Sequence, residues 1–141
     1  MPTILTSQQL QHRLDSSPFN RWLGLRVSEL TDENVTLHMV VRTEMAGNPD
    51  TGVLHGGLMG CLIDAAGALA IIARTGNSVA TIDFSVDFLQ AQRHPDIFAK
   101  ATVLRLGNRI STTEIHVREG NDRLIASGRA VYMSVQAANS A

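Results

Sequence analysis

One carboxylate interrupts an otherwise apolar stretch of the chain between residues 51 and 73. The residue is Asp64, and no basic side chain lies within four positions of it on either side. A carboxylate on so apolar a segment must find a hydrogen-bond partner, take up a proton or face a cavity. Because carboxylates serve enzymes as general bases and nucleophiles, Asp64 is the first candidate for a catalytic group.

The residues at the beginning of this stretch are suited to bind an anion. Asn48, His55, Gly56 and Gly57 lie where a loop passes into a predicted helix. Unpaired backbone N–H groups at a helix start, together with the positive end of the helix dipole, stabilise an anion or a developing oxyanion. Glycine lets a ligand approach the backbone closely, so this segment is a second candidate half-site.

The two half-sites cannot act on one atom within a single chain. Gly56 and Asp64 are eight residues apart, which is about 12 Å along an ideal helix and on different faces. If two copies of the helix lie antiparallel across a two-fold axis, the start of one comes beside the carboxylate of the other. The residues that would permit this approach are all small: Gly57, Gly60, Gly67 and Ala68.

The hydropathy pattern predicts one antiparallel sheet curled around a long central helix. The helix covers residues 55–74, and its predicted core stripe comprises Leu58, Leu62, Ala65, Leu69 and Ile72. A helix at 6–14, strands at 22–30 and 34–41 and a loop at 43–54 come first. Strands at 78–90, 97–106, 109–118 and 123–135 follow and are expected to form a four-strand meander. The fold class is therefore α+β, with about six strands.

The strand at 78–90 shows an alternation typical of a half-buried strand. Its apolar phase comprises Ala80, Ile82, Phe84, Val86 and Phe88, and its polar phase comprises Thr81, Asp83, Ser85 and Asp87. The pattern predicts that the two sets lie on opposite faces of the sheet.

Length and composition favour a single soluble domain over residues 1–141, with a peripheral N-terminal helical segment at 1–20 and a frayed tail at 136–141. The chain is 44% hydrophobic and 18% charged, with a net charge of −1, which disfavours binding to nucleic acid or to an anionic membrane. The single cysteine and the lack of a secretory leader indicate a cytoplasmic protein. The apolar run at 56–73 approaches the length of a membrane span, but it contains Asp64 and several glycines, so we interpret it as a buried core helix.

No metal or cofactor is expected from the sequence. The five histidines are scattered without the short spacings that metal sites use, at His12, His38, His55, His94 and His116.

The motif of Asn48, then Gly-Val-Leu-His-Gly-Gly-Leu-Met-Gly-Cys-Leu-Ile-Asp over residues 52–64, then Thr-Ile-Asp-Phe-Ser-Val-Asp-Phe-Leu over residues 81–89, resembles a known family. It is similar to the hotdog-fold acyl-CoA thioesterases of the PaaI-like type, over roughly residues 22–135. The most specific part is His-Gly-Gly with an Asp nine residues after the His.

The resemblance implies hydrolysis of an acyl-CoA thioester without a metal or cofactor, in a homodimer or a tetramer of two dimers. Asp64 would activate water or attack the carbonyl carbon, and the Gly56 N–H would polarise the thioester oxygen. Asn48 and Thr81 would place the water. A small aromatic or a short- to medium-chain acyl group would fit.

This chain departs from the family pattern at two supporting positions. Asn48 lies one residue too far from His55, so Asp50 could take its place, and Thr81 comes one residue early after Asp64. His55 is a further catalytic candidate, although we favour a structural bond to the loop, and Gly57 is a candidate for substrate binding. The arginine that meets the CoA phosphates cannot be chosen among Arg74, Arg93 and Arg109.

Three alternatives stay open. Asp64 could be a structural carboxylate bonded to a backbone amide, because structural networks also bury acids. The chain could be a hotdog hydratase or dehydratase, although the extended motif with a catalytic His is not seen. It could also be a non-catalytic acyl-CoA-binding module. Cys61, one turn from Asp64 and without a basic partner, is interpreted as a small core residue.

Overall fold

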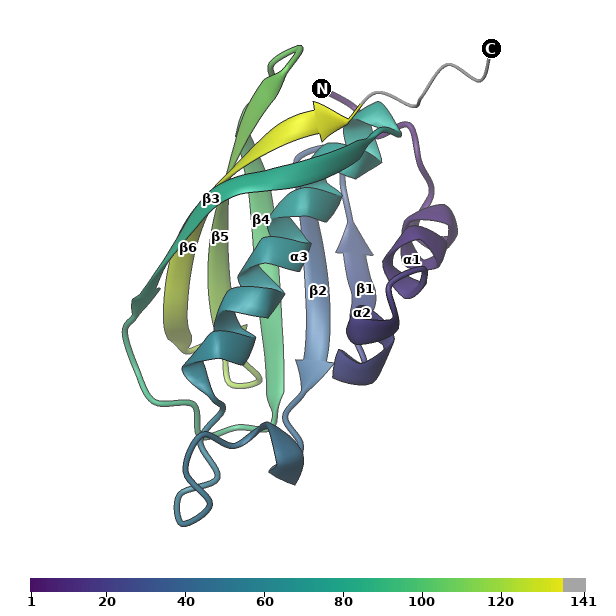
Figure 1. Cartoon of the computed structure of the whole chain (residues 1–141). Coiled ribbons are helices and arrows are strands. Elements are labelled where there is room, and N and C mark those ends of the chain that lie inside the picture. Colours follow the sequence, from purple (N-terminus) through teal and green to yellow (C-terminus); the bar gives the residue numbers. More distant parts are fainter. Residues whose placement is uncertain (136–141) are drawn as a thin grey trace.

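A six-stranded antiparallel sheet curves around one long helix in the computed structural model of the chain (Figure 1). The structure describes residues 1–135, and the predicted frayed tail at 136–141 lies outside them. The strand order is β1-β2-β4-β5-β6-β3, and every neighbouring pair is antiparallel. The central helix is α3, Gly56–Thr75. The predicted α+β hotdog architecture is confirmed.

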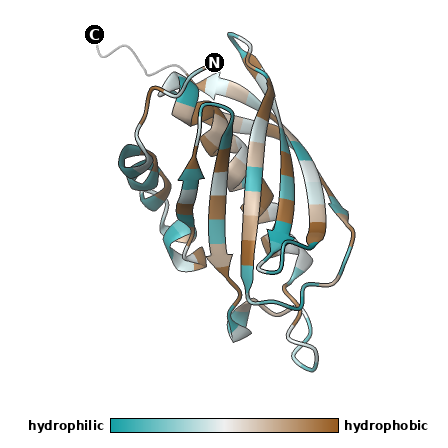
Figure 2. Ribbon diagram, turned by 180° about the vertical axis from the view of Figure 1, so that it is seen from behind, coloured by the Kyte–Doolittle hydropathy of each residue, from teal (hydrophilic) through white to brown (hydrophobic). Residues whose placement is uncertain are grey.

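The other elements have the following bounds. The strands are β1 Arg26–Leu30, β2 Asn34–Val40, β3 Ser78–Phe88, β4 Asp96–Arg105, β5 Ile110–Glu119 and β6 Leu124–Val135. The helices are α1 Ser7–Asp15, α2 Pro18–Leu23 and the short 3-10 helix η1 Thr43–Met45. Seen from the side of the sheet opposite α3, hydrophilic and hydrophobic bands alternate along the strands, as expected for a sheet with one wet and one packed face (Figure 2).

The strand predicted to begin at residue 22 begins instead at Arg26, because a short helix occupies the residues before it. The Ser17 hydroxyl caps α2 by accepting a hydrogen bond from the Asn20 N–H at 3.3 Å, and Pro18 takes the first helical position. Gly24 ends the helix with a φ of 71°, a left-handed conformation that glycine adopts without strain. These caps are local signals that outweighed the strand-like composition around Trp22.

The predicted four-strand meander is wrong at its first strand. β3 pairs with β6 at the edge of the sheet, and only β4, β5 and β6 follow one another as neighbours. The segment at 89–95 contains no glycine and has no tight-turn dipeptide, unlike the Gly107-Asn108 turn between β4 and β5. It therefore crosses from one part of the sheet to another and does not close a hairpin.

One face of α3 packs into the curve of the sheet, and this face differs from the predicted stripe. The residues of α3 that are fully enclosed are Leu62, Ile63, Ala66, Ala70, Ile71 and Ala73. Of the predicted stripe, Leu62 and Leu69 are buried, whereas Leu58, Ala65 and Ile72 are partly exposed. α3 has the length and hydropathy of a membrane span, but more than half of it is buried inside this fold.

Two glycines of α3 give room to side chains of the same chain. A Cβ added at Gly60 would lie 3.1 Å from the ring of Phe84. One added at Gly67 would lie 2.5 Å from the Tyr132 hydroxyl oxygen and 2.6 Å from Thr113 Oγ1. These glycines were expected to let a second helix approach. They instead serve packing within the chain, so of the four small residues only Gly57 and Ala68 remain on the more open side of α3.

Gly67→Ala should destabilise the fold by about 1–3 kcal/mol, because the new methyl group overlaps two hydroxyl oxygens that the sheet holds in place. Urea unfolding monitored by circular dichroism measures the change. Adding Tyr132→Phe should recover part of the loss by removing one of those oxygens. A Gly67→Ala protein as stable as the wild type would contradict this packing, since alanine otherwise favours a helix.

Candidate active site

At the start of α3, the backbone N–H of Gly57 makes a hydrogen bond within the described part of the chain, and that of Gly56 does not. His55 is the N-cap residue, and its Nδ1 accepts a hydrogen bond from the Gly57 N–H at 2.9 Å. Within residues 1–135, the Gly56 N–H has no hydrogen-bond partner, as expected for the first position of a helix. His55 thus acts here as a cap, which agrees with the structural interpretation of this residue. With no partner among the described residues, the Gly56 N–H is therefore free to donate a hydrogen bond.

A cavity of about 410 Å³ adjoins Gly56. Most of its walls are apolar and come from the loop before α3, from α3 and from the end of β3: Val53, Leu54, Met59, Phe88, Leu89 and Ala91. The ring of Phe88 lies so close to Gly56 that a Cβ there would be 3.2 Å from it. Glycine at this position therefore leaves space for both the ring and an incoming ligand.

Asp64 lies in the middle of α3 and is half-buried, with two contacts that fix it. Its Oδ1 accepts a hydrogen bond from the Thr81 hydroxyl at 2.8 Å, and its peptide oxygen accepts one from the Tyr132 hydroxyl at 2.6 Å. Burial and then the nearby Asp64 charge raise the pKa of Tyr132, so the phenol stays protonated and remains a donor. Sequence reasoning identified Asp64 and Thr81 but missed Tyr132.

A β-bulge in β3 brings Thr81 to the helix side of the sheet. The pairing with β6 shifts between Thr81 and Asp83, so that Ile82 is an extra residue. Thr81 pairs with Tyr132, and Phe84 and Phe88 pair with Ala130 and Ala126, which places all of them on the face toward α3. The predicted unbroken alternation is therefore wrong at Ile82.

The loop before α3 projects beyond the first turn of that helix (Figure 1). Its base is closed by the bridge between Ala46 and Leu54, and Asn48 and Asp50 lie at its exposed tip. The Asn48 Oδ1 accepts a hydrogen bond from the Asp50 N–H at 2.9 Å, so the two residues bond to each other. The chain therefore brings His55, Gly56 and Gly57 together at one end of α3, and Asp64 with Thr81 near its middle. The loop tip stands apart from the Asp64 group.

Two further residues of α3, Cys61 and Arg74, have surroundings that disfavour a part in the reaction. Burial, followed by the nearby Asp64 charge, raises the pKa of the Cys61 thiol, which disfavours a thiolate nucleophile. Arg74 is buried and donates to the Ala70 and Asp32 carbonyl oxygens at 2.8 and 2.6 Å. It closes the end of α3 and is not placed to meet CoA phosphates, whereas Arg93 and Arg109 are exposed.

Comparison with known proteins identifies the family. A family model described as the thioesterase superfamily matches residues 51–126, which is more than half of the chain and includes Gly56 and Asp64. The chain belongs to the thioesterase superfamily. It is a thioester hydrolase that carries its glycine-rich turn and its carboxylate within the matched segment.

Relatives of this thioesterase extend the match to nearly the whole chain. The medium/long-chain acyl-CoA thioesterase YigI of Escherichia coli is 27% identical over 153 residues, covering 94% of this chain and 99% of its own. A solved thioesterase-superfamily structure is 34% identical, with a TM-score of 0.88 over 92% of this chain and 98% of its own. A thioesterase from Haemophilus influenzae, at 24% identity and a TM-score of 0.87 over 99% of both chains, shares the fold.

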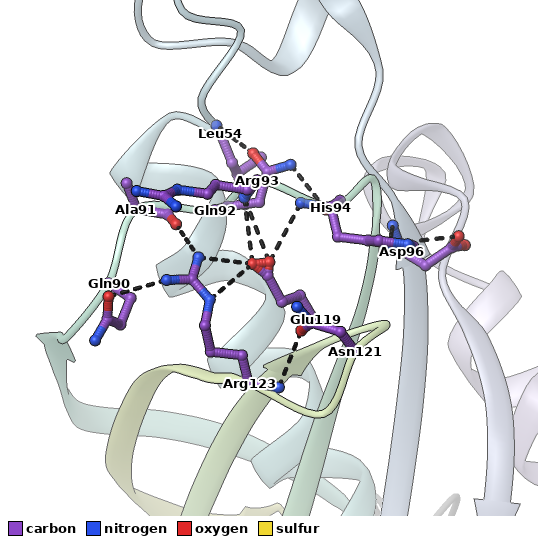
Figure 3. Close-up of polar contacts among 10 residues, drawn as sticks. All are labelled: Leu54, Gln90, Ala91, Gln92, Arg93, His94, Asp96, Glu119, Asn121 and Arg123. Carbon is purple, nitrogen blue, oxygen red and sulfur yellow. Dashed lines mark hydrogen bonds and ion pairs between the residues drawn. The ribbon is translucent and has the colours of Figure 1, made fainter.

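A buried ion pair below the start of α3 is a feature that sequence reasoning missed (Figure 3). The Glu119 side chain is fully buried and accepts hydrogen bonds from Arg123 at 2.8 Å and from the Arg93 and His94 N–H groups. Glu119 lies on the inward phase of β5 with Ile115 and Val117. A carboxylate on the buried face of a strand, followed four residues later by an arginine across a turn, indicates a buried ion pair.

Glu119→Gln should remove most of the acid sensitivity that this pair confers. Burial alone raises the pKa of Glu119, but the hydrogen bonds from Arg123, Arg93 and His94 together hold it below its ordinary value of 4.5. A pKa lowered by folding stabilises the protein above the unfolded pKa, and that stability is lost as the pH falls through the folded pKa.

The wild type should therefore exceed Glu119→Gln in stability by about 2 kcal/mol at pH 7 and lose that difference below pH 4.5. Urea unfolding at several pH values measures it. Glu114→Gln, at an exposed position of the same strand, is the control and should change little. A gap between wild type and Glu119→Gln that stays constant down to pH 3 would contradict this assignment.

Proposed function

We propose that this thioesterase hydrolyses acyl-CoA with a composite site, built from Asp64 of one protomer and Gly56 of its partner. The observation that carries the proposal is that one helix bears both an unengaged N–H at Gly56 and a half-exposed carboxylate held by Thr81. The two are about 12 Å apart along the helix. A single chain cannot place a thioester carbonyl between them, and two antiparallel copies can.

The proposed reaction begins when the thioester oxygen accepts a hydrogen bond from the Gly56 N–H. Asp64 takes a proton from water, the hydroxide adds to the carbonyl carbon, and the Gly56 N–H stabilises the oxyanion. The C–S bond then breaks and the free acid forms. The CoA thiolate takes up the proton that Asp64 removed from water. Alternatively the carboxylate adds directly, and water hydrolyses the resulting anhydride. A positioned base supplies about 10²–10⁴-fold and an oxyanion donor about 10²–10³-fold.

The edges of the sheet support pairing of two chains through β3. At the β1 edge, the Gln11 side chain of α1 accepts a hydrogen bond from the Val27 N–H and donates one to the Leu25 carbonyl oxygen. These backbone groups are therefore not available to pair with another strand. β3 is 11 residues long, lies at the other edge, and exposes Ile82 and Phe88. Long apolar edges of this kind favour pairing with another strand.

Contacts within the chain predict the register of this pairing. Gly56 lies against Phe88, and Asp64 is bonded to Thr81. If Phe88 of one β3 lies opposite Thr81 of an antiparallel partner, Gly56 comes beside the partner's Asp64. The two-fold axis then falls near Phe84 and Ser85. We take this homodimer as the minimal active unit, and two such dimers can pair into a tetramer without changing the site.

The remaining site residues have supporting roles in this proposal. His55 holds the first turn of α3 through the Gly57 N–H, and Thr81 orients the Asp64 carboxylate. Asn48 and Asp50 precede the start of α3, which in the dimer lies beside the partner's Asp64, so one of them can help to place the attacking water there.

We propose acyl-CoA esters of medium-length alkyl acids as the substrates of a cytoplasmic, PaaI-like enzyme. The support is the apolar cavity beside Gly56, with Met59 and Phe88 in its walls, and the name of the relative that covers 94% of the chain. An assay over acetyl-, octanoyl-, palmitoyl- and phenylacetyl-CoA tests the choice. A kcat/KM highest for octanoyl-CoA is expected, and a preference for the aromatic ester would overturn it.

Asp64→Asn should lower kcat for octanoyl-CoA by roughly 10²-fold or more while the protein keeps its fold, because the amide cannot accept a proton or act as a nucleophile. Release of free CoA followed with a thiol reagent measures the rate. Asp122→Asn is the matched control, since Asp122 is exposed and its φ of 67° suits asparagine. A folded Asp64→Asn enzyme with wild-type kcat would refute the proposal.

A further inference from the structure

One buried amide fastens the loop between β3 and β4 to the segment that begins α3. The Gln92 side chain is almost fully enclosed, and its Oε1 accepts a hydrogen bond from the Leu54 N–H at 3.0 Å. Its Nε2 donates to the His94 carbonyl oxygen at 2.8 Å (Figure 3). Both ends of the amide are thus engaged, and they join segments that are 38 residues apart in the sequence.

The backbone just before Gly56 is held from two sides. The Leu54 N–H donates to Gln92, and the next N–H, that of His55, donates to the Met45 carbonyl oxygen at 2.8 Å. The Gly56 N–H belongs to the peptide that follows. Its direction therefore depends on these two bonds and on the first turn of α3.

Glu119 makes the backbone around Gln92 rigid. Its buried carboxylate receives the N–H groups of Arg93 and His94, the two residues that follow Gln92. Arg123, paired with this carboxylate, also donates to the Ala91 carbonyl oxygen at 2.7 Å and to the Gln90 side chain at 2.9 Å. The loop is thus fixed on both sides of Gln92, so its amide reaches Leu54 from a constrained position.

Gln92 also lines the cavity that adjoins Gly56, together with Phe88, the last residue of β3 before this loop. The loop follows directly after Phe88, whose ring packs on Gly56. Through Gln92 it also holds the peptide N–H of Leu54, two residues before Gly56. Loss of the amide would leave the Leu54 N–H and the His94 carbonyl without their partner in a buried place, and the backbone would shift to find others.

We propose that Gln92 is a positioning residue for hydrolysis, holding the Leu54 peptide so that the Gly56 N–H points at the thioester oxygen. The inference rests on the oxyanion role proposed for Gly56. An error of about 1 Å in such a donor costs roughly 10²-fold in rate. Because the donor acts most strongly on the oxyanion of the transition state, its displacement lowers kcat more than it raises KM.

The test compares Gln92→Met, which has a similar length without the amide, with Gln92→Glu, whose carboxyl oxygen can still accept from the Leu54 N–H. Gln8→Met is the matched control, because Gln8 is exposed on α1 and belongs neither to this loop nor to the lining of the cavity beside Gly56. With octanoyl-CoA as substrate, we expect Gln92→Met to lower kcat roughly 10–100-fold with KM within about threefold. Gln92→Glu should recover part of the loss, and Gln8→Met should match the wild type.

Three outcomes overturn the inference: a kcat of Gln92→Met within twofold of Gln8→Met, a change confined to KM, or no recovery in Gln92→Glu when both variants melt at the same temperature. If Gln92→Met does not fold, kcat of Gln92→Glu and of Glu119→Gln decides, and wild-type kcat in both overturns it. An Asp64→Asn enzyme assayed alongside separates the two ideas, because its full activity would remove the proposed function itself.

Discussion

A rigid helix keeps apart the two groups of this thioesterase that we propose act on the substrate. Gly56 and Asp64 belong to one continuous α3, buried along one side by the sheet, so no hinge within it can bring the Gly56 N–H to the Asp64 carboxylate. The rest of the fold follows from this constraint. The sheet fixes α3 and leaves the Asp64 side of the helix accessible. It ends at β3, an edge strand with which a second chain can pair and so bring its own Gly56 to the Asp64 of the first.

Hydrogen bonds around α3 set each half-site separately. Tyr132 and Thr81 hold Asp64 through its peptide oxygen and its carboxylate, and the bulge at Ile82 is what allows Thr81 to face α3. At the other end, His55 occupies the Gly57 N–H and so leaves that of Gly56 for a ligand. The contacts of each half-site thus lie within one chain, and in the proposed mechanism only the reaction requires two.

Much of this architecture could be predicted from the sequence, and the errors have physical causes. The helix, its carboxylate and six strand positions follow from local periodicity and glycine spacing. The phase of α3 could not be predicted, because a helix that is apolar all round carries no stripe. Hydropathy shows which face of a strand is buried but not which strand lies beside it, so the place of β3 next to β6 was missed. The partners of Glu119 and Tyr132 come from distant elements, which spacing alone does not reveal.

The composite site is tested most directly by mixing two inactive variants. Gly56→Pro removes the proposed donor at the first helical position, where the backbone suits proline because His55 already has an extended ψ of 130°. The new Cβ lies 3.2 Å from the ring of Phe88, which is exposed and has to shift by a few tenths of an ångström. Asp64→Asn removes the carboxylate. Co-expressed in equal amounts, they should regain roughly a quarter of wild-type activity, because half of the dimers are mixed and each has one complete site. Activity no higher than that of the two variants measured separately would contradict a site shared between chains.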